Sequence, residues 1–289
     1  MTALSETLSR FRHGAGDPTT RLAAGEFWRA TNTPQGAGTV RIDFRDHQVH
    51  AQAWGPGGDW LLHRVRAMTG ANDAGFEFAD AHPAIMSAQH LHRGLRFGAS
   101  GTLYHELLPT ILGQRITAGE GLQQWRQLVQ QLGERAPGPD HGLRLPPTAD
   151  ALLSKPTWWF HPLGIEVKRA TSLLQVAKHA PRLDEWALLP PAAAAAKLSL
   201  LPGIGRWTVG SVMATALGDP DALAVGDYHL KNVVVHALTG RARGSDEEML
   251  ELLAPYVGQR GRAARLLSLA GHGAPKFGPR QRVRPIGRW

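Results

Sequence analysis

The stretch "LPGIGRWTVGSVMATALGDPDALAVGD" runs from Leu201 to Asp227 and decides which fold the chain is expected to adopt. Its first letters place Pro202 and two glycines around Ile204, directly before a helical pattern. Pro202 fixes its own φ angle, while the glycines lack a Cβ atom and can adopt positive φ. LPGIG therefore predicts the whole connection between two helices, with Ile204 directed into the core. The first helix is expected to end near residues 199–201 and the second to begin near Arg206.

The five residues of this turn allow two interpretations. In the first, a phosphate approaches the bare backbone N–H groups at the start of the following helix, where the helix dipole also favours an anion. Arg206 and Lys197 would add positive charge to that site. In the second, the glycines only cap a tight turn between helices, which is common in helical proteins.

The composition narrows the choice of partner. The 289 residues suffice for one large or two modest domains. Lys and Arg exceed Asp and Glu by 32 − 24 = 8, which favours a polyanionic partner, nucleic acid before an anionic membrane. The absence of cysteine excludes disulfides, Cys-ligated zinc and iron–sulfur clusters. No apolar run has the length of a signal peptide or a membrane span, so we expect a cytoplasmic protein, nucleoid-associated if bacterial.

Two kinds of periodicity divide the chain. Residues 39–54 alternate between apolar and polar side chains, which predicts an antiparallel hairpin with one buried face. From about Leu103 the apolar spacing becomes helical. The predicted helical faces comprise Leu122, Trp125, Val129 and Leu132; Val167, Ala170, Leu174 and Ala177; and Val209, Val212, Met213 and Ala216. The expected fold class is α+β, with an N-terminal antiparallel β-containing domain over residues 1–98 and helical subdomains over 99–220 and 221–289, the last ending in the basic tail "FGPRQRVRPIGRW".

Several motifs together resemble the helix-hairpin-helix DNA glycosylase superfamily. The branch that matches best is the alkylpurine type, similar to 3-methyladenine DNA glycosylase II, whose N-terminal β domain agrees with the alternating strands. The resemblance implies two mainly helical subdomains with a DNA cleft between them. The motifs that carry it are "LPGIGRWTVGSV" at the hairpin, "LLPTILGQRIT" (107–117), "PLGIEVKRATSLLQVA" (162–177) and "AVGDYHLKN" (224–232).

The resemblance implies that Asp227 is the catalytic carboxylate. Cleavage of an N-glycosidic bond builds positive charge on the deoxyribose, and a fixed carboxylate stabilises that charge and orients or deprotonates the attacking water. Taken alone, Asp227 is also a typical N-cap of the amphipathic helix that follows it, and Lys231 four residues later allows an ion pair. The capping and catalytic roles are compatible.

The resemblance also implies the chemistry of the base pocket. Bifunctional members carry a lysine where this chain has Trp207, so a monofunctional enzyme without Schiff base or strand cleavage is expected. Trp207 is predicted to line the pocket with Ser211 and Tyr228, since an indole face attracts a cationic alkylated purine. Ser211 and Gly261 stand where the branch has aromatic residues, which leaves the substrate open.

The remaining contacts implied by the resemblance are with double-stranded DNA. Arg115, or else Ile116, would fill the gap left by the extruded base, with Gln114 against the opposite strand. The backbone carbonyls of Ser199, Leu201 and Ile204 would hold a structural monovalent cation, Na⁺ or K⁺, and no other cofactor is expected. The predicted DNA-binding residues are Gln114, Arg115, Gly203, Ile204, Gly205, Arg206 and Thr208, on a protein expected to be a monomer.

Two other functions stay open at this point. Helix-hairpin-helix elements also serve as phosphate-binding elements in DNA-binding proteins without catalysis. The altered pocket equally suits a glycosylase for deaminated or oxidised bases. A role of Asp227 in catalysis would distinguish an enzyme from a non-catalytic DNA-binding protein. The lesion that is removed would distinguish an alkylpurine glycosylase from one for deaminated or oxidised bases.

Overall fold

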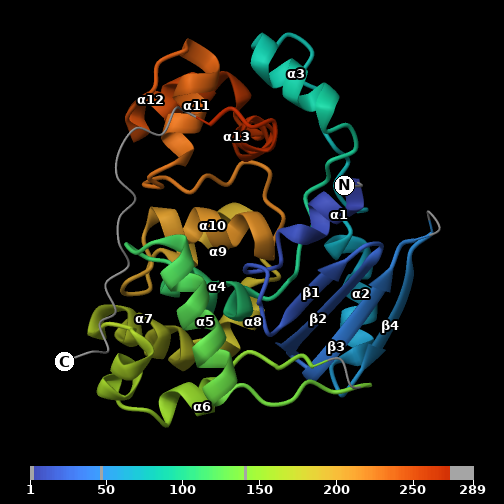
Figure 1. Cartoon of the computed structure of the whole chain (residues 1–289), viewed down its shortest axis with the longest axis vertical. Coiled ribbons are helices and arrows are strands. Elements are labelled where there is room, and N and C mark those ends of the chain that lie inside the picture. Colours follow the sequence, from blue (N-terminus) through green and yellow to red (C-terminus); the bar gives the residue numbers. More distant parts are fainter. Residues whose placement is uncertain (1–2, 46–47, 140–141, 274–289) are drawn as a thin grey trace.

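The computed structural model describes residues 3–45, 48–139 and 142–273, so the basic tail predicted from residue 277 lies outside the described part. The fold is mixed, with a four-stranded antiparallel sheet near the N-terminus followed by many helices (Figure 1). This confirms the expected combination of an N-terminal β-containing part and a mainly helical remainder. No helix within the described ranges is long and apolar enough to span a membrane.

The sheet is a simple meander in the order β1-β2-β3-β4. The predicted hairpin over residues 39–54 is confirmed, since Val40 pairs with Ala53 and Ile42 with Ala51. The strands are β1 (Thr20–Ala23), β2 (Glu26–Thr33), β3 (Gly36–Asp43) and β4 (His50–Trp54).

Strand β2 is covered on both faces, which explains why the sequence pattern did not reveal it. Phe27 packs into a core with the helices on one side of the sheet. Trp28 lies on the other side and stacks on Trp54 with ring centroids 5.4 Å apart, beneath the segment that contains Leu143 and Leu145. Burial of both faces removes the alternation of apolar and polar residues that marks a half-exposed strand.

Three helices belong to the N-terminal part and were not predicted, whereas the helical pattern from Leu103 onward is confirmed. The predicted face of the hairpin's second helix is buried throughout. Val167 lies on a predicted buried face but is 60% exposed, because it begins its helix. The helices are α1 (Ala3–Ser9), α2 (Gly58–Met68), α3 (Pro83–Leu91), α4 (Leu103–Leu112), α5 (Ala118–Leu132), α6 (Ala149–Leu153), η1 (Thr157–Leu163), α7 (Val167–Lys178), α8 (Ala180–Trp186), α9 (Pro191–Leu198), α10 (Arg206–Ala216), α11 (Leu230–Thr239), α12 (Asp246–Leu253), η2 (Ala254–Tyr256) and α13 (Arg260–Leu269).

The helices form two separate apolar cores. The larger core joins α4, α5, α7, α9 and α10, with Trp125 and Phe160 fully buried. The second core joins α11, α12 and α13 and also takes in Ile85 and Ala88 of α3 (Figure 1). Helix α3 thus packs with the C-terminal helices, although its sequence position falls in the predicted N-terminal domain. The domain boundaries stay a prediction.

Candidate active site

The connection between α9 and α10 is the tight turn that its sequence predicted. Ile204 is buried in the larger core, as expected. Gly203 has φ +83°, and a Cβ atom there would lie 2.0 Å from Ser172 Oγ, so both the backbone angle and the packing require glycine.

Gly205 differs from Gly203 in its backbone angle and in the space around its Cα atom. Its φ is −95°, so Gly205 does not use the positive φ that glycine can adopt: the chain has already reversed at Gly203 and enters α10 extended. A Cβ atom at Gly205 would meet nothing within 4 Å. The Gly205 carbonyl accepts the first helical hydrogen bond, from Val209. The N–H groups that precede Val209 in α10 are therefore available to an external acceptor beside open space.

Asp227 is held by three neutral donors. One carboxylate oxygen, Oδ1, accepts the backbone N–H groups of His229 (2.8 Å) and Leu230 (2.9 Å) at the start of α11. The other oxygen, Oδ2, accepts the indole N–H of Trp207 at 3.1 Å. The predicted N-cap position is wrong by two residues, because α11 begins at Leu230 with His229 as its N-cap, although Asp227 still accepts from the first N–H groups of the helix. Trp207 and Asp227 lie together although twenty residues separate them in the sequence.

A close approach of two backbones places Asp227 beside α10. Gly210 lies on α10, and a Cβ atom there would lie 1.8 Å from the carbonyl oxygen of Leu223. Only glycine lets the segment that leads to Asp227 lie directly against the helix that carries Trp207. The glycine of "RWTVG" thus has a role that its sequence position alone did not reveal.

The loop around Asp227 is fixed from α12, a contact that sequence reasoning missed. Asp246 Oδ1 accepts the backbone N–H of Gly226 at 3.0 Å, and Asp246 Oδ2 forms a salt bridge with Lys231 at 3.5 Å. Lys231 is therefore engaged by Asp246 and not by Asp227, so the simple ion pair considered from the sequence does not form. No salt bridge joins Asp227 to any residue in the described part of the chain.

The other predicted pocket residues lie near this carboxylate with different exposure. Trp207 is half-buried, and its ring lies against Gly113, where a Cβ atom would be 3.5 Å from the indole. Ser211 is one turn further along α10 and donates to the Trp207 carbonyl at 2.8 Å. Tyr228 is 68% exposed, with its ring against that of His229. Gly261, where an aromatic residue was expected, allows α13 to contact the carbonyls of Pro220 and Ala222.

The predicted strand-separating loop follows α4 and carries a strained residue. Arg115 is exposed and has φ +57°, a left-handed conformation that no other non-glycine residue of the described ranges adopts. Such a conformation costs on the order of 1 kcal/mol or more and persists only where the surroundings hold it. The neighbouring Ile116 is half-buried, and Thr117 begins α5 with a reciprocal capping box to Glu120.

The amide nitrogen of Gln114 is bonded to the hairpin, and the contact of this residue with the opposite DNA strand remains a prediction. Gln114 Nε2 donates to the Gly203 carbonyl and to Thr208 Oγ1, both at 2.9 Å. Thr208 is 2% exposed, and its hydroxyl contacts Gln114 inside the protein. Its backbone N–H, at the start of α10, is therefore the group of Thr208 that could contact DNA. Arg206 is exposed at the helix start, where it was predicted to meet DNA.

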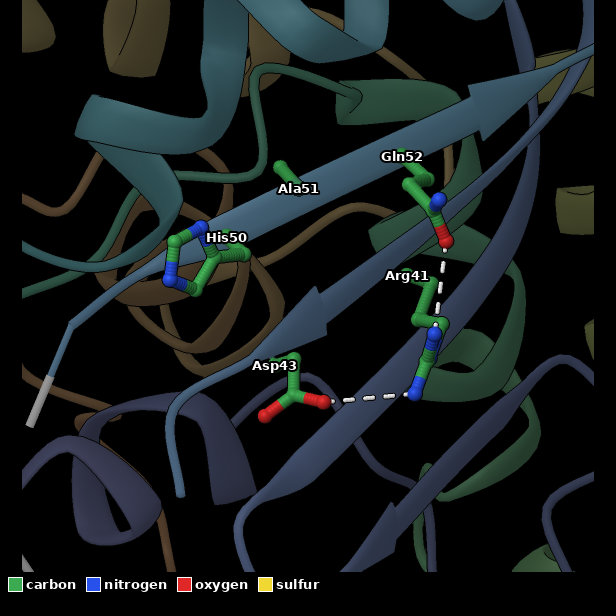
Figure 2. A pocket seen from close by; sticks show the side chains of 5 residues that line it. All are labelled: Arg41, Asp43, His50, Ala51 and Gln52. Carbon is green, nitrogen blue, oxygen red and sulfur yellow. Dashed lines mark hydrogen bonds and ion pairs between the residues drawn. The ribbon is translucent and has the colours of Figure 1, made fainter. Parts of the chain in front are cut away.

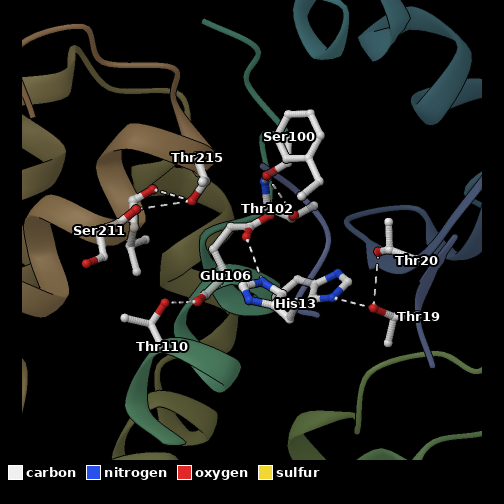
Figure 3. A network of polar contacts seen from close by, with 12 residues as sticks. His13, Thr19, Thr20, Ser100, Thr102, Glu106, Thr110, Ser211 and Thr215 are labelled. Carbon is white, nitrogen blue, oxygen red and sulfur yellow. Dashed lines mark hydrogen bonds and ion pairs between the residues drawn. The ribbon is translucent and has the colours of Figure 1, made fainter. Parts of the chain in front are cut away.

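A second polar cluster lies beneath the sheet and was not predicted. Arg29 of β2 forms a salt bridge with Glu106 of α4 at 2.5 Å, with both side chains 1% exposed. Burial raises the pKa of Glu106, but Arg29, His13 and His105 together outweigh this and lower it to about 2. Figure 3 shows Glu106 directed toward His13, which lies 3.6 Å away. His105, the neighbour of Glu106, is also buried, and its pKa is well below the usual value because of burial and of Arg29.

The sequence held a signal for this buried cluster. His105 and Glu106 interrupt the otherwise apolar run "LYHELLPTIL", and charged residues inside such a run require partners. The partner Arg29 could not be identified, because it lies on a strand that the sequence did not reveal.

Two surface hollows lie away from Asp227. One, of about 390 Å³, lies on the outer face of β3 and β4 and is lined by Arg41, Asp43, His50, Ala51 and Gln52 (Figure 2). Its polar groups are already engaged, since Arg41 contacts both Asp43 and Gln52. The other lies between α3 and α13, with Phe76 and Arg93 among its lining residues. Neither contains a residue predicted to bind or cleave DNA.

Comparison with known proteins identifies the fold. No protein-family model and no curated protein sequence matches the chain. The structure of 3-methyladenine DNA-glycosylase from Archaeoglobus fulgidus aligns with a TM-score of 0.76 over 93% of this chain and 94% of that one, at 18% identity. An 8-oxoguanine glycosylase/lyase from Clostridium acetobutylicum, solved with double-stranded DNA, aligns with a TM-score of 0.65 over 90% and 89%, at 14% identity. This chain therefore has the fold of the helix-hairpin-helix DNA glycosylases.

Proposed function

We propose that this protein is a monofunctional DNA glycosylase that hydrolyses the N-glycosidic bond of a damaged base, an alkylated purine, in duplex DNA. Its products are the free base and an abasic site. The observation that carries the proposal is the state of Asp227: a carboxylate fixed by three neutral donors, beside the hairpin, with no cation paired to it in the described part of the chain.

This arrangement suits the charge that develops in the reaction. As the base departs, the deoxyribose becomes positively charged, and a carboxylate stabilises it most when it is already oriented and its own charge is not neutralised. Backbone and indole N–H groups hold Asp227 without cancelling its charge. The same oxygens can orient the attacking water or take its proton.

Trp207 supports hydrolysis without strand cleavage. Schiff-base chemistry requires an amine at the sugar, and at this position the chain has an indole that donates to Asp227. Lys231, the lysine closest in sequence to Asp227, forms a salt bridge with Asp246. A water molecule activated at Asp227 is then the nucleophile, and the abasic product remains uncut.

An alkylated purine is the preferred substrate in this proposal. Such a base is already positively charged, so it leaves without a protonating acid and is attracted to the electron-rich face of Trp207. The similar protein from Archaeoglobus fulgidus is named a 3-methyladenine DNA-glycosylase. The similar enzyme from Clostridium acetobutylicum was solved with 8-oxoG in its DNA, and an oxidised purine is therefore the second candidate.

DNA binding in this proposal uses both helical cores. The larger core, within residues 99–220, presents the hairpin, and the core that includes residues after 221 presents Asp227, with the DNA cleft between them. The backbone around Gly205 binds a phosphate, and exposed Arg115 enters the gap left by the extruded base. We expect a monomer to be sufficient, because hairpin, wedge and carboxylate come from one chain.

The hairpin carbonyls offer a structural site for a monovalent cation. Carbonyl oxygens suit Na⁺ or K⁺, and the three proposed ligands, Ser199, Leu201 and Ile204, lie within one turn. The Leu201 carbonyl accepts the N–H of Ile204 at 3.1 Å and keeps a second lone pair. When bound, the cation would add positive charge beside the phosphate and take no part in bond cleavage.

The decisive experiment is a screen of duplexes that each carry one lesion. The substrates are 3-methyladenine, hypoxanthine and 8-oxoguanine, and abasic sites are revealed by cleavage with alkali. We expect excision of the alkylated purine, with strand breaks only after alkali. Absence of excision from every duplex by the wild-type protein, with binding retained, would identify a non-catalytic DNA-binding protein. Strand breaks without alkali would contradict the argument from Trp207.

A further inference from the structure

We propose that Gln114 is a positioning residue that links the strand-separating loop to the phosphate-binding hairpin. This inference rests on the proposed function and deepens it. Gln114 lies next to Arg115, and its single side-chain nitrogen donates to the Gly203 carbonyl and to Thr208 Oγ1. These acceptors lie 89 and 94 residues further along the chain, one in the turn and one in the first turn of α10.

The two acceptors belong to the most constrained part of the hairpin. Gly203 cannot be replaced without a collision with Ser172. Thr208 is buried, so its hydroxyl has little freedom to move. An amide that bonds to both therefore fixes the position of the loop relative to the backbone that would bind the phosphate.

The rest of the loop is fastened at its two ends but not at Arg115. Before the loop, the Leu112 carbonyl accepts a hydrogen bond from buried Arg169 at 2.9 Å. After it, Thr117 and Glu120 form the capping box of α5. Gln114 supplies the hydrogen bonds nearest to Arg115, whose left-handed backbone needs such support.

This geometry couples two steps that would otherwise be independent. A phosphate bound at the hairpin fixes Gly203 and α10, and through Gln114 it also fixes the residue that precedes Arg115. The wedge then stands in a defined place above the bound strand. Without the link, the hairpin would still bind phosphate, but Arg115 would no longer be held at the position needed to separate bases.

The test removes the hydrogen bonds between the loop and the hairpin, once at the donor and once at an acceptor. Gln114→Met keeps the length of the side chain and removes its donors, while Thr208→Val removes one acceptor with little change in shape. Gln123→Met makes the same change at an exposed glutamine of α5, outside the loop and the hairpin, and is the matched control. Thermal unfolding verifies that each variant folds, and Thr208→Val tests the same link if Gln114→Met proves unstable.

Two substrates distinguish a positioning role from general damage. One is the excised lesion paired in a duplex, and the other is the same lesion opposite an abasic site, where the base is already partly unstacked. We expect Gln114→Met to lower kcat on the paired lesion about tenfold and on the unstacked lesion less than about threefold, with Gln123→Met near wild type. Equal losses on both substrates, or no loss on either, would overturn the proposal.

A binding measurement keeps this inference separate from the proposed activity. A duplex with 2-aminopurine at the target position fluoresces more when that base unstacks, and it requires no excision. At saturating protein we expect a clear rise in fluorescence with wild type and Gln123→Met, and less than about half of that rise with Gln114→Met. An equal rise in fluorescence with Gln114→Met would refute the link, and so would the absence of a rise with bound wild-type protein. Both outcomes can be read whether or not any lesion is excised.

Discussion

Asp227 and Glu106 are two carboxylates held in opposite ways. Asp227 is half-buried, and its three donors are backbone and indole N–H groups that carry no net charge. Glu106 is fully buried and is neutralised by Arg29, with His13 beside it. Both side chains are rigid, but only Asp227 keeps a negative charge that a new cation could use.

The difference agrees with the catalytic role proposed for Asp227 and the structural role of Glu106. A charge inside the protein is tolerated only when it is paired. Glu106 therefore joins α4 to β2 through Arg29, and its charge is not available to stabilise another cation. A carboxylate that stabilises a developing cation must instead be oriented by neutral dipoles. If this distinction is correct, replacing each acid should damage a different property of the protein.

The largest effect is expected from Asp227→Asn. The amide keeps the size of the side chain but removes its charge, so excision should fall about 10³-fold, equivalent to about 4 kcal/mol of transition-state stabilisation. DNA binding and the unfolding temperature should stay close to wild type, because the hydrogen-bond acceptor for α11 remains. Single-turnover excision and fluorescence anisotropy measure the two properties. Retention of more than about a tenth of the activity would place the catalytic charge elsewhere.

Glu106→Gln should damage stability instead. It leaves the Arg29 guanidinium buried without a counter-charge, although the amide oxygen can still accept one hydrogen bond. We expect a loss of about 3 kcal/mol in the free energy of unfolding, at the lower end for a broken buried pair. Excision per folded molecule at low temperature should change less than about threefold, because no hydrogen bond or salt bridge of the described residues joins Glu106 to Asp227.

The matched control for Glu106→Gln removes both charges. Arg29→Met combined with Glu106→Met replaces the ion pair by apolar side chains of similar length. This double variant should be more stable than Glu106→Gln alone, since no unpaired charge remains. Urea denaturation of wild type, Arg29→Met, Glu106→Met and the double variant completes the cycle, and strictly additive losses would show that the pair is not coupled.

A smaller effect follows from acidification. The pKa of Glu106 falls from 4.5 in the unfolded chain to about 2 in the fold, so the stability it provides is complete above pH 4.5 and is lost as the pH falls toward 2. By pH 3 about 2 kcal/mol of this stability is lost. The depressed pKa of His105 has the same sign and begins to lower stability below pH 6.5, where the unfolded imidazole takes up a proton. Urea midpoints measured against pH should fall less steeply below pH 4.5 in Glu106→Gln than in wild type.

Features of these two sites could be predicted from the sequence where residues close together in the chain determine them. The hairpin and the helix face of Val209 and Val212 follow from residue types within a few positions of one another. Asp227 was predicted beside the start of a helix, two residues before the N-cap that the structure shows. The superfamily fold was recognised from those motifs and is confirmed by the similar structures. The catalytic role of Asp227 remains a prediction.

What the sequence did not reveal was the choice among distant partners. Lys231 was considered as a partner of Asp227, and the packing of α12 against α11 brings Asp246 to it instead. The two hairpin acceptors of Gln114 lie 89 and 94 residues away in the sequence, and only the fold brings them within its reach. Gly205 could adopt positive φ, yet one reversal at Gly203 is enough. Partner identity is a property of tertiary geometry and not of local pattern.

The smallest effect is expected from Trp207→Phe, and it tests whether neutral donors are what prepare Asp227. Phenylalanine keeps an aromatic face but removes the N–H that bonds to Asp227 Oδ2, so kcat should fall about tenfold, equivalent to about 1.4 kcal/mol. In an Asp227→Asn background the same change should cost almost nothing, because the indole would act only through the carboxylate. Single-turnover excision of an alkylated purine by the four proteins gives both numbers. Equal losses in the two backgrounds would show that Trp207 acts on the base itself, and the neutral donors at Asp227 would then be those of His229 and Leu230 alone.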